Sequence, residues 1–187
     1  GASNRVIGVL SQKEFAFIEK PPMLLGRLCF GAAYYNGCIY AIGGRTQRND
    51  QVSACERLVL DENRWESIPP LPQPCRFAST IVLEAFLSLY VLGGQCYPKF
   101  NRMDLIQRLA FDKLTWDILH LKLPTPMISL ACFKTSDFEA YFFIEHTLYC
   151  FDPRRNSLQP LINLPSSNPE CSAGPEYFHE GYVLFNC

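Results

Sequence analysis

The sequence predicts an all-β fold of the propeller class, in which small four-stranded antiparallel sheets repeat around an axis. Two observations support this prediction. The run Tyr40–Gly44 (YAIGG) returns 50 residues later as Tyr90–Gly94 (YVLGG), and Trp65, which follows a polar turn, returns 51 residues later as Trp116. A repeat of about 50 residues, made of short β-like runs and closed by paired glycines, is typical of one propeller blade.

The first complete repeat spans residues 26–72. A hairpin is expected at its start, because the dipeptide Asn36-Gly37 between two apolar runs favours a two-residue turn. A second turn is expected at the polar residues 61–63. The four strands expected in this repeat are Arg27–Tyr35, Cys38–Ile42, Ala54–Leu60 and Arg64–Ile68.

The remaining chain follows the same order with losses. Residues 73–124 form a second full blade, with Glu84–Phe86 as its hairpin turn, and residues 125–165 form a degenerate blade that lacks the paired glycines and the Trp. Residues 1–25 resemble the last two strands of a blade, and residues 166–187 resemble the first two strands of a further blade. We expect residues 1–187 to be one propeller segment of about four blades' worth of sheet, as part of a larger propeller; a closed four-bladed ring is the alternative.

The repeat landmarks resemble those of the kelch repeat, whose blades carry a Gly-Gly pair after the second strand and a Trp in the fourth. This resemblance implies a kelch-type β-propeller in which the glycines allow close packing and the Trp fills the space between blades. Paired glycines at a strand end also suit positive φ angles, and a Trp that recurs at a fixed position is usually a core residue. The matching residues are Gly43, Gly44, Trp65, Gly93, Gly94 and Trp116, together with Arg27 and Arg76 at the start of each unit.

Composition excludes several classes of function. The 17 Lys and Arg residues nearly balance the 18 Asp and Glu residues, so a nucleic-acid partner is not expected. The most apolar stretch, Ile81–Leu92, contains Glu84 and Ser88 and is much shorter than the roughly 20 residues of a membrane-spanning helix, so no membrane partner is expected. The chain begins without a signal-peptide pattern, and we expect an intracellular, cytoplasmic protein.

Nine cysteines are present, an odd number with no C-x-x-C spacing, which argues against a disulfide framework and a structural zinc site. We expect reduced, mostly buried thiols. Cys29 and Cys171 align with Ala78 and Ser129 in the repeat, which predicts that small size is what this position requires.

No convergent catalytic set is expected. The histidines His120, His146 and His179 fall at different positions of different repeats, and the sequence contains none of the common nucleophile, metal or phosphate-binding motifs. Asp61 and Asp112 recur at one turn together with Asp152, which is typical of turn formers. We therefore expect no catalytic residues, no metal and no cofactor. A catalytic propeller of the oxidase or sugar-epimerase type remains an alternative by fold alone.

Binding residues are expected in the long loops that follow the second strand of the two full blades. These loops are polar, differ from each other and carry more positive than negative charge, with two aromatic side chains. Arg and aromatic residues are enriched in binding hot spots. The predicted partner-binding residues are Arg45, Gln47, Arg48, Asp50, Tyr97, Lys99, Phe100 and Arg102.

The predicted function is non-enzymatic protein–protein interaction through this mildly basic loop face, with an acidic or extended segment of another protein as partner. The alternative is that the loop charges only solvate the surface. The kelch resemblance implies two roles: a substrate receptor of a cullin-type ubiquitin ligase, or an actin or cytoskeletal scaffold. The sequence does not separate them.

Overall fold

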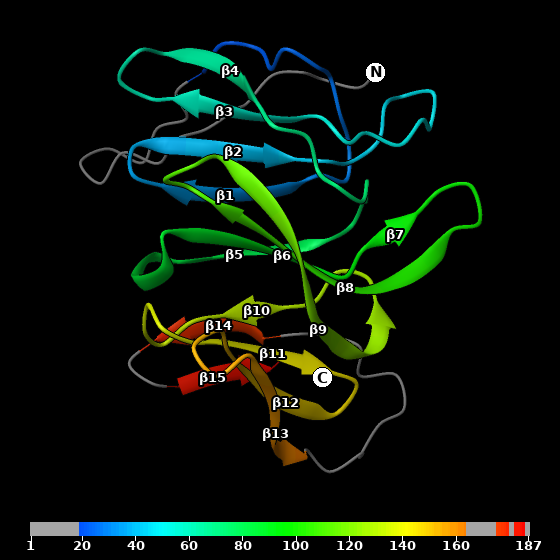
Figure 1. The fold of residues 1–187 in the computed structure, drawn as a ribbon, viewed down its shortest axis with the longest axis vertical. Coiled ribbons are helices and arrows are strands. Elements are labelled where there is room, and N and C mark those ends of the chain that lie inside the picture. Colours follow the sequence, from blue (N-terminus) through cyan, green and yellow to red (C-terminus); the bar gives the residue numbers. More distant parts are fainter. Residues whose placement is uncertain (1–18, 164–174, 180–181, 186–187) are drawn as a thin grey trace.

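The structure is a computed structural model that describes residues 19–163, 175–179 and 182–185. Within these residues the fold is all-β, with one short 3-10 helix, η1 (Glu84–Phe86), and with no helix long and apolar enough to cross a membrane (Figure 1). The strands are β1 (Gly31–Tyr35), β2 (Cys38–Ile42), β3 (Cys55–Val59), β4 (Arg64–Ile68), β5 (Ser79–Leu83), β6 (Ser88–Leu92), β7 (Gln95–Cys96), β8 (Asn101–Ala110), β9 (Thr115–Met127), β10 (Cys132–Phe133), β11 (Ala140–Ile144), β12 (Thr147–Asp152), β13 (Ser157–Asn163), β14 (Pro175–His179) and β15 (Tyr182–Phe185).

The first sheet has the predicted order β1-β2-β3-β4, antiparallel throughout. Its first hairpin turns at Asn36 and Gly37, whose φ angles are 44° and 72°, as the type I′ turn requires. The predicted first strand was too long, because β1 begins only at Gly31. The chain before it pairs Leu28 with Arg45 and then bends at Cys29, whose φ is 56°.

The second sheet keeps the order of the first but has a longer outer half. Strands β5, β6, β8 and β9 form the sheet, and the short β7 pairs with the start of β8. The segment predicted as a loop at 95–102 is therefore a small hairpin, with its turn at residues 97–100. The turn between β5 and β6 is η1, followed by Leu87 with a φ of 45°.

The third sheet, β10-β11-β12-β13, confirms the strand order predicted for the degenerate blade. Its middle strands are joined by Glu145 and His146 alone, and Glu145 has a φ of 54°. Strands β14 and β15 form a separate two-stranded antiparallel hairpin. The expectation for residues 1–18 and that for Cys171 lie outside the described residues.

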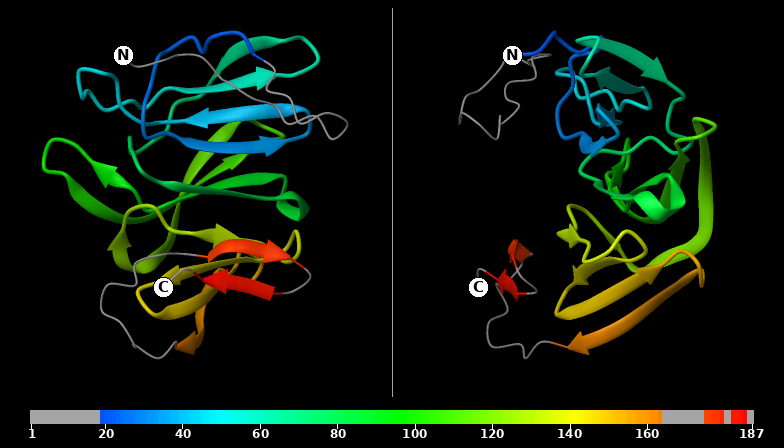
Figure 2. Two further views of the ribbon diagram at one scale, coloured as in Figure 1. Left: turned by 180° about the vertical axis from the view of Figure 1, so that it is seen from behind. Right: turned by 90° about the vertical axis from the view of Figure 1, so that its left-hand side faces the viewer.

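The sheets are stacked like the blades of a propeller. The right-hand view of Figure 2 shows them fanned along an arc, with β10 on the inner side and β9 and β13 on the outer side. The first strands β1, β5 and β10 are neighbours. The Thr80 hydroxyl donates to the Ala32 carbonyl at 2.6 Å, and the Cys132 thiol donates to the Thr80 carbonyl at 3.6 Å. The predicted all-β propeller fold is confirmed.

Alternate residues of each central strand face opposite neighbours, and this places the cores between the sheets. Tyr40 and Ile42 of β2 pack with Val91 of β6 in the core between the first two sheets. The other face of β6, with Tyr90 and Leu92, packs against the third sheet. Burial of these apolar faces is the main force that holds consecutive sheets together.

The paired glycines lie where one sheet touches the incoming chain of the next. Gly43 and Gly93 both have a φ of 61°, and a Cβ on either would lie 2.6 Å from a carbonyl oxygen, of Cys75 and Met127 respectively. The next glycine of each pair donates its N–H to that same carbonyl at 2.8 Å. A side chain at Gly43 or Gly93 would therefore collide with the neighbouring sheet.

The two tryptophans make the same contact one sheet apart. Trp65 donates from Nε1 to the carbonyl of Pro21, and Trp116 donates to that of Pro69, both at 2.8 Å. Leu158, at the corresponding position of the third sheet, has no such donor. There β9 is 13 residues long, and its leucines Leu119, Leu121 and Leu123 join the core to which Leu158 also packs. The extended strand takes over the contact that the Trp makes elsewhere.

The structure corrects the alignment of Arg27 with Arg76. In the first sheet, Leu28 exchanges two backbone hydrogen bonds with Arg45, and in the second sheet Arg76 does so with Gln95. Arg76 therefore corresponds to Leu28. The residue that corresponds to Arg27 is Cys75, because Cys75 directly precedes Arg76 as Arg27 directly precedes Leu28. Their counterpart in the third sheet is Met127, since the second glycine of each pair binds the carbonyl of Cys75 or of Met127.

With this alignment, two positions are seen to change together in residue type from one sheet to the next. Arg27 is fully buried and forms an ion pair with Glu56, whose carboxylate also accepts the N–H groups of Leu24 and Leu25. In the second sheet the same two positions hold Cys75 and Gln107, both buried and neutral. They correspond because Glu56 pairs across β2–β3 with Ala41, as Gln107 pairs across β6–β8 with Val91. The third sheet has Met127 and Tyr149 at these positions.

The predicted requirement for small size at Cys29 is wrong. Its counterpart is Phe77 rather than Ala78, because the N–H of Phe77 binds the carbonyl of Cys29 and the N–H of Ser129 binds that of Phe77. Cys29, Phe77 and Ser129 share a φ between 51° and 56°. This position therefore selects a backbone conformation, and side-chain size is free to vary.

Candidate functional site

The loops that follow β2 and β6 project from the same side of the stack (Figure 1) and contact each other directly. We name residues 45–51 and 95–102 the two-loop surface. Gln51 joins the two parts, because its side-chain oxygen accepts the N–H of Tyr97 and its amide nitrogen donates to the carbonyls of Pro74 and Gln95. The first loop is closed on itself by Thr46, whose N–H donates to the carbonyl of Asp50 at 2.8 Å.

Arg76 lies beneath this surface and forms hydrogen bonds with both of its loops. The guanidinium donates to Oδ1 of Asn49 at 2.7 Å and, from two of its nitrogens, to Oε1 of Gln95 at 2.9 and 3.1 Å. It also stacks over two rings, with its central carbon 4.8 Å from the centre of the Phe100 ring and 5.5 Å from that of Phe77. Arg76 is only 8% exposed. These hydrogen-bond acceptors are neutral amides, so the positive charge is not cancelled.

Two aromatic side chains contact each other at the turn of the second loop. Tyr97 and Phe100 meet edge to face, with ring centres 5.5 Å apart, and they are 50% and 45% exposed. Phe100 is held from below by Arg76, and its carbonyl accepts the amide N–H of Gln95 at 2.8 Å. Aromatic side chains that are exposed yet fixed in place lose little conformational entropy when they bind a partner.

The cations of the two-loop surface differ from most of those elsewhere in the described residues, which form ion pairs. Arg57, Arg108 and Arg154, for example, each form an ion pair with Asp or Glu, at 2.9, 2.6 and 2.8 Å respectively. Within residues 19–163, no ion pair involves the cations of the two-loop surface. These are Arg45, Arg48, Lys99 and Arg102.

Comparison with known proteins supports the kelch-repeat family. Residues 26–72, the first sheet with its flanking segments, match the kelch motif. This part of the chain is a kelch repeat. The chain is 31% identical over 78 residues to Kelch repeat and BTB domain-containing protein 2 of Cowpox virus (strain GRI-90 / Grishak), covering 42% of this chain and 14% of the viral protein. It is 24% identical over 170 residues to Kelch-like protein 23 of Homo sapiens, covering 89% of this chain and 30% of the human protein.

A solved structure agrees on the fold of this kelch-repeat protein. The structure of YjhT superimposes with a TM-score of 0.66 at 15% sequence identity, covering 78% of this chain and 54% of that one. This similarity concerns the fold alone. The kelch-repeat chain therefore spans about half the length of that structure and less than a third of the two relatives named above.

The structure brings most of the predicted binding residues of the kelch-repeat protein to one surface. Gln47, Arg48 and Asp50 are exposed in the first loop, whereas Arg45 is half-buried, because its backbone bridges both Leu28 and Gln51. Exposed residues of the second loop complete the surface. They are Tyr97, Lys99, Phe100 and Arg102.

Sequence reasoning missed the residues that support this surface. Asn49 and Gln51 are ordinary polar loop residues, and Gln95 directly follows a glycine pair, so none of them stood out. Arg76 was noticed but was placed at the wrong repeat position. A repeat alignment that fixed Arg76 opposite Leu28 could have separated it from the buried Arg27.

Among residues 19–163, 175–179 and 182–185, no group of three or more His, Cys, Asp or Glu side chains is placed to hold a metal ion. Burial raises the pKa of the Cys55 and Cys132 thiols to about 11 and that of Cys75 to about 12, so these three thiols stay protonated and unreactive at neutral pH.

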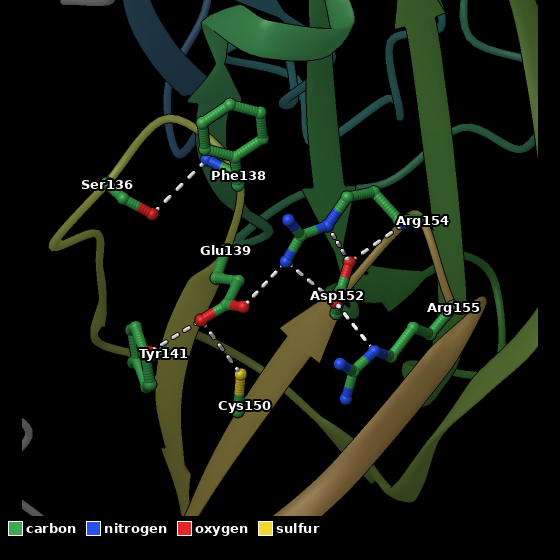
Figure 3. A network of polar contacts seen from close by, with 8 residues as sticks. All are labelled: Ser136, Phe138, Glu139, Tyr141, Cys150, Asp152, Arg154 and Arg155. Atoms are coloured by element: carbon green, nitrogen blue, oxygen red, sulfur yellow. Dashed lines mark hydrogen bonds and ion pairs between the residues drawn. The ribbon is translucent and has the colours of Figure 1, made fainter.

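A polar network lies on one face of the third sheet (Figure 3). Arg154 binds Asp152 and Glu139 through Nη2, at 2.9 and 2.8 Å, and Tyr141 donates its hydroxyl to Glu139 at 2.8 Å. As predicted for a turn former, Asp152 accepts the backbone N–H of Arg154 at 2.9 Å. Cys150 donates its thiol to the same carboxylate oxygen of Glu139.

This network replaces a motif found in the other two sheets. Tyr40 faces Arg57 across β2 and β3, and Arg57 in turn pairs with Glu66 on β4. The second sheet repeats the arrangement with Tyr90, Arg108 and Asp117. The third sheet has Tyr141, Cys150 and Gln159 instead, so it has lost both charges. Its ion pairs come from the turn after β12.

Proposed function

We propose that this kelch-repeat chain is a non-enzymatic protein-interaction module that binds its partner through the two-loop surface. One observation carries the proposal: cations without acidic partners share the two-loop surface with an exposed aromatic pair, and Arg76 stacks over the Phe100 ring of that pair. Desolvated aromatic and Arg side chains supply most of the energy at protein interfaces. A surface already rigid before binding lowers the entropy cost of association.

The partner fits the description of an acidic or extended segment of another protein. Arg48, Lys99 and Arg102 are exposed and free to pair with carboxylates, while Tyr97 and Phe100 offer apolar area between them. Complementary charge speeds the encounter and selects the partner, and salt weakens this contribution.

The finer proposal is that the module recognises substrates for a cullin-type ubiquitin ligase in the cytoplasm. Its support is the likeness to a viral protein named for a kelch repeat and a BTB domain. A cytoskeletal scaffold would use the same surface, and the identity of the partner distinguishes the two roles.

The test is a display screen of random peptides against the wild-type protein, followed by affinity measurement for the selected sequences. We expect enrichment of Asp and Glu near an apolar residue. Changing Arg48→Glu and Arg102→Glu together is expected to weaken these peptides by about 100-fold, from the loss of two charge contacts of roughly 1 to 2 kcal/mol each.

A matched control is Lys113→Glu. Lys113 is an exposed cation in the turn between β8 and β9, at the end of the sheet opposite the two-loop surface. This variant should bind as the wild type does. Equal binding by all variants, with folding intact, would show that the two-loop surface is not the binding site.

A further inference from the structure

We infer that Ser157 is a phosphorylation site, modified by a serine kinase that selects arginine ahead of its target, and that Arg155 holds the resulting phosphate. Ser157 follows Arg154, Arg155 and Asn156, so two arginines stand three and two residues before it. Kinases choose substrates partly through such charge patterns. A four-residue motif is weak by itself, so the surroundings of the serine decide.

Ser157 can be reached from solvent together with its two arginines. The side chains of Arg154 and Arg155 are 45% and 73% exposed in the turn between β12 and β13. Ser157 is the first residue of β13, and in the described sheet β13 pairs only with β12, so its outer edge is open. The Ser157 hydroxyl forms no hydrogen bond with the described residues and keeps access to water.

A site for the phosphate lies beside the hydroxyl. A cavity of about 180 Å³ is lined by Ser157, Asp152 and Arg155, with Glu139 and Gln159 among its other walls. The guanidinium of Arg155 contacts Asp152 only through Nε, at 3.6 Å, the longest of the ion pairs in Figure 3. This exposed side chain is therefore the one that can turn from the carboxylate to a phosphate with little loss.

The transfer itself is a balanced phosphoryl transfer from ATP. The bond between the γ-phosphorus and the bridging oxygen breaks, a bond from Ser157 Oγ to phosphorus forms, ADP leaves, and the hydroxyl proton passes to the base of the kinase. Before transfer, Glu139 and Asp152 balance Arg154 and Arg155. Afterwards the site gains close to two negative charges directly opposite Asp152, its cross-strand neighbour. Repulsion from Asp152 and attraction to Arg155 then rearrange the network on this face of the third sheet.

The chain contains a matched site that should stay unmodified. Ser79 also has an arginine, Arg76, three residues before it. Its hydroxyl, however, donates to the carbonyl of Leu130 between the second and third sheets. Ser67 has Arg64 at the same distance but follows directly after the acidic Glu66.

The first experiment treats the folded protein with ATP and a purified serine kinase that selects Arg at both positions, and locates the phosphate by mass spectrometry. We expect one phosphate at Ser157 and none in Ser157→Ala. Arg155→Gln should slow the reaction by about tenfold or more, because it removes one charge-assisted contact to the kinase. Phosphate on other residues only, or modification of the urea-unfolded chain alone, would overturn the assignment.

The second experiment tests the role of Arg155 after modification. The phosphoserine signal is followed by phosphorus NMR against pH, in the folded protein and in a peptide of residues 157–163, which lacks both arginines. The Arg155 guanidinium favours the dianion whereas Asp152 and Glu139 disfavour it, so the pKa of the phosphate in the protein, about 6 in the peptide, reflects the balance of the two effects. Arg155→Gln, phosphorylated to completion, should raise this pKa above that of the wild-type protein. An equal pKa in both variants would remove Arg155 from the proposal.

Discussion

The buried ion pair Arg27–Glu56 of the first sheet occupies the positions that hold the neutral residues Cys75 and Gln107 in the second sheet. Substitutions of Arg27 and Glu56 test this correspondence. Changing Arg27→Met leaves the Glu56 carboxylate buried with its two backbone donors but without its cation, and it removes the donors to the carbonyls of Gly43 and Ala54. Breaking a buried ion pair from one side costs about 3 to 5 kcal/mol. Glu56→Gln leaves the Arg27 charge unpaired and should cost a similar amount.

The double variant Arg27→Met with Glu56→Gln is expected to lose far less than the two single variants together. It places in the first sheet the kind of neutral pair that Cys75 and Gln107 form in the second, where Gln107 binds both backbone groups of Gln73 at 2.9 Å. We expect the free energy of unfolding to fall by about 2 to 4 kcal/mol in the double variant, a coupling of at least about 2 kcal/mol.

The assay is equilibrium unfolding in urea followed by tryptophan fluorescence, because Trp65 packs in the core behind the first sheet. Each single variant is compared with the wild type and with the double variant. Losses that add within about 0.5 kcal/mol would mean that the two residues act independently. The assignment of one shared position pair to successive sheets would then be wrong.

Two further predictions concern packing and pH. Trp65→Ala should lower the free energy of unfolding by about 3 to 5 kcal/mol, whereas Trp116→Ala, at a half-buried position, should cost clearly less; equal melting temperatures for the two variants would contradict this ranking. The hydrogen bond and charge of Arg154 hold the pKa of Asp152 below its ordinary value, so this contact stabilises the fold above pH 4 and is lost as acid protonates the carboxylate. The melting temperature of Asp152→Asn should therefore fall less than that of the wild type between pH 5 and pH 3, and parallel curves would show that Asp152 contributes nothing to acid sensitivity.

Predictions from the sequence succeeded where a local rule decides the structure. The hairpin at Asn36-Gly37 follows from the positive φ angles that a type I′ turn requires, and the glycine pairs follow from close approach of a neighbouring carbonyl. They failed where the neighbour decides. The extension of β9 to Met127 compensates for Leu158, and it depends on pairing with the start of β8.

The candidate site shows the same division. Exposed Arg and aromatic residues in long loops could be read from the sequence as binding candidates. The hydrogen bonds of Arg76, Asn49, Gln51 and Gln95 that hold these loops in place could not be predicted from the sequence, because they join residues up to 46 positions apart. The phosphorylation proposal likewise depends on Asp152 lying opposite Ser157, which only the pairing of β12 with β13 establishes.

The sequence by itself determined the order of the main strands in each repeat and the family landmarks, because turn chemistry and alternating burial act between residues close in the chain. Only the tertiary structure decided which residues of successive repeats are equivalent. A one-residue shift moves a side chain from the core to the loop surface, and it separates the buried ion pair of Arg27 from the exposed face that Arg76 supports. Hydrogen bonds between sheets, which leave no local trace in the sequence, set that alignment.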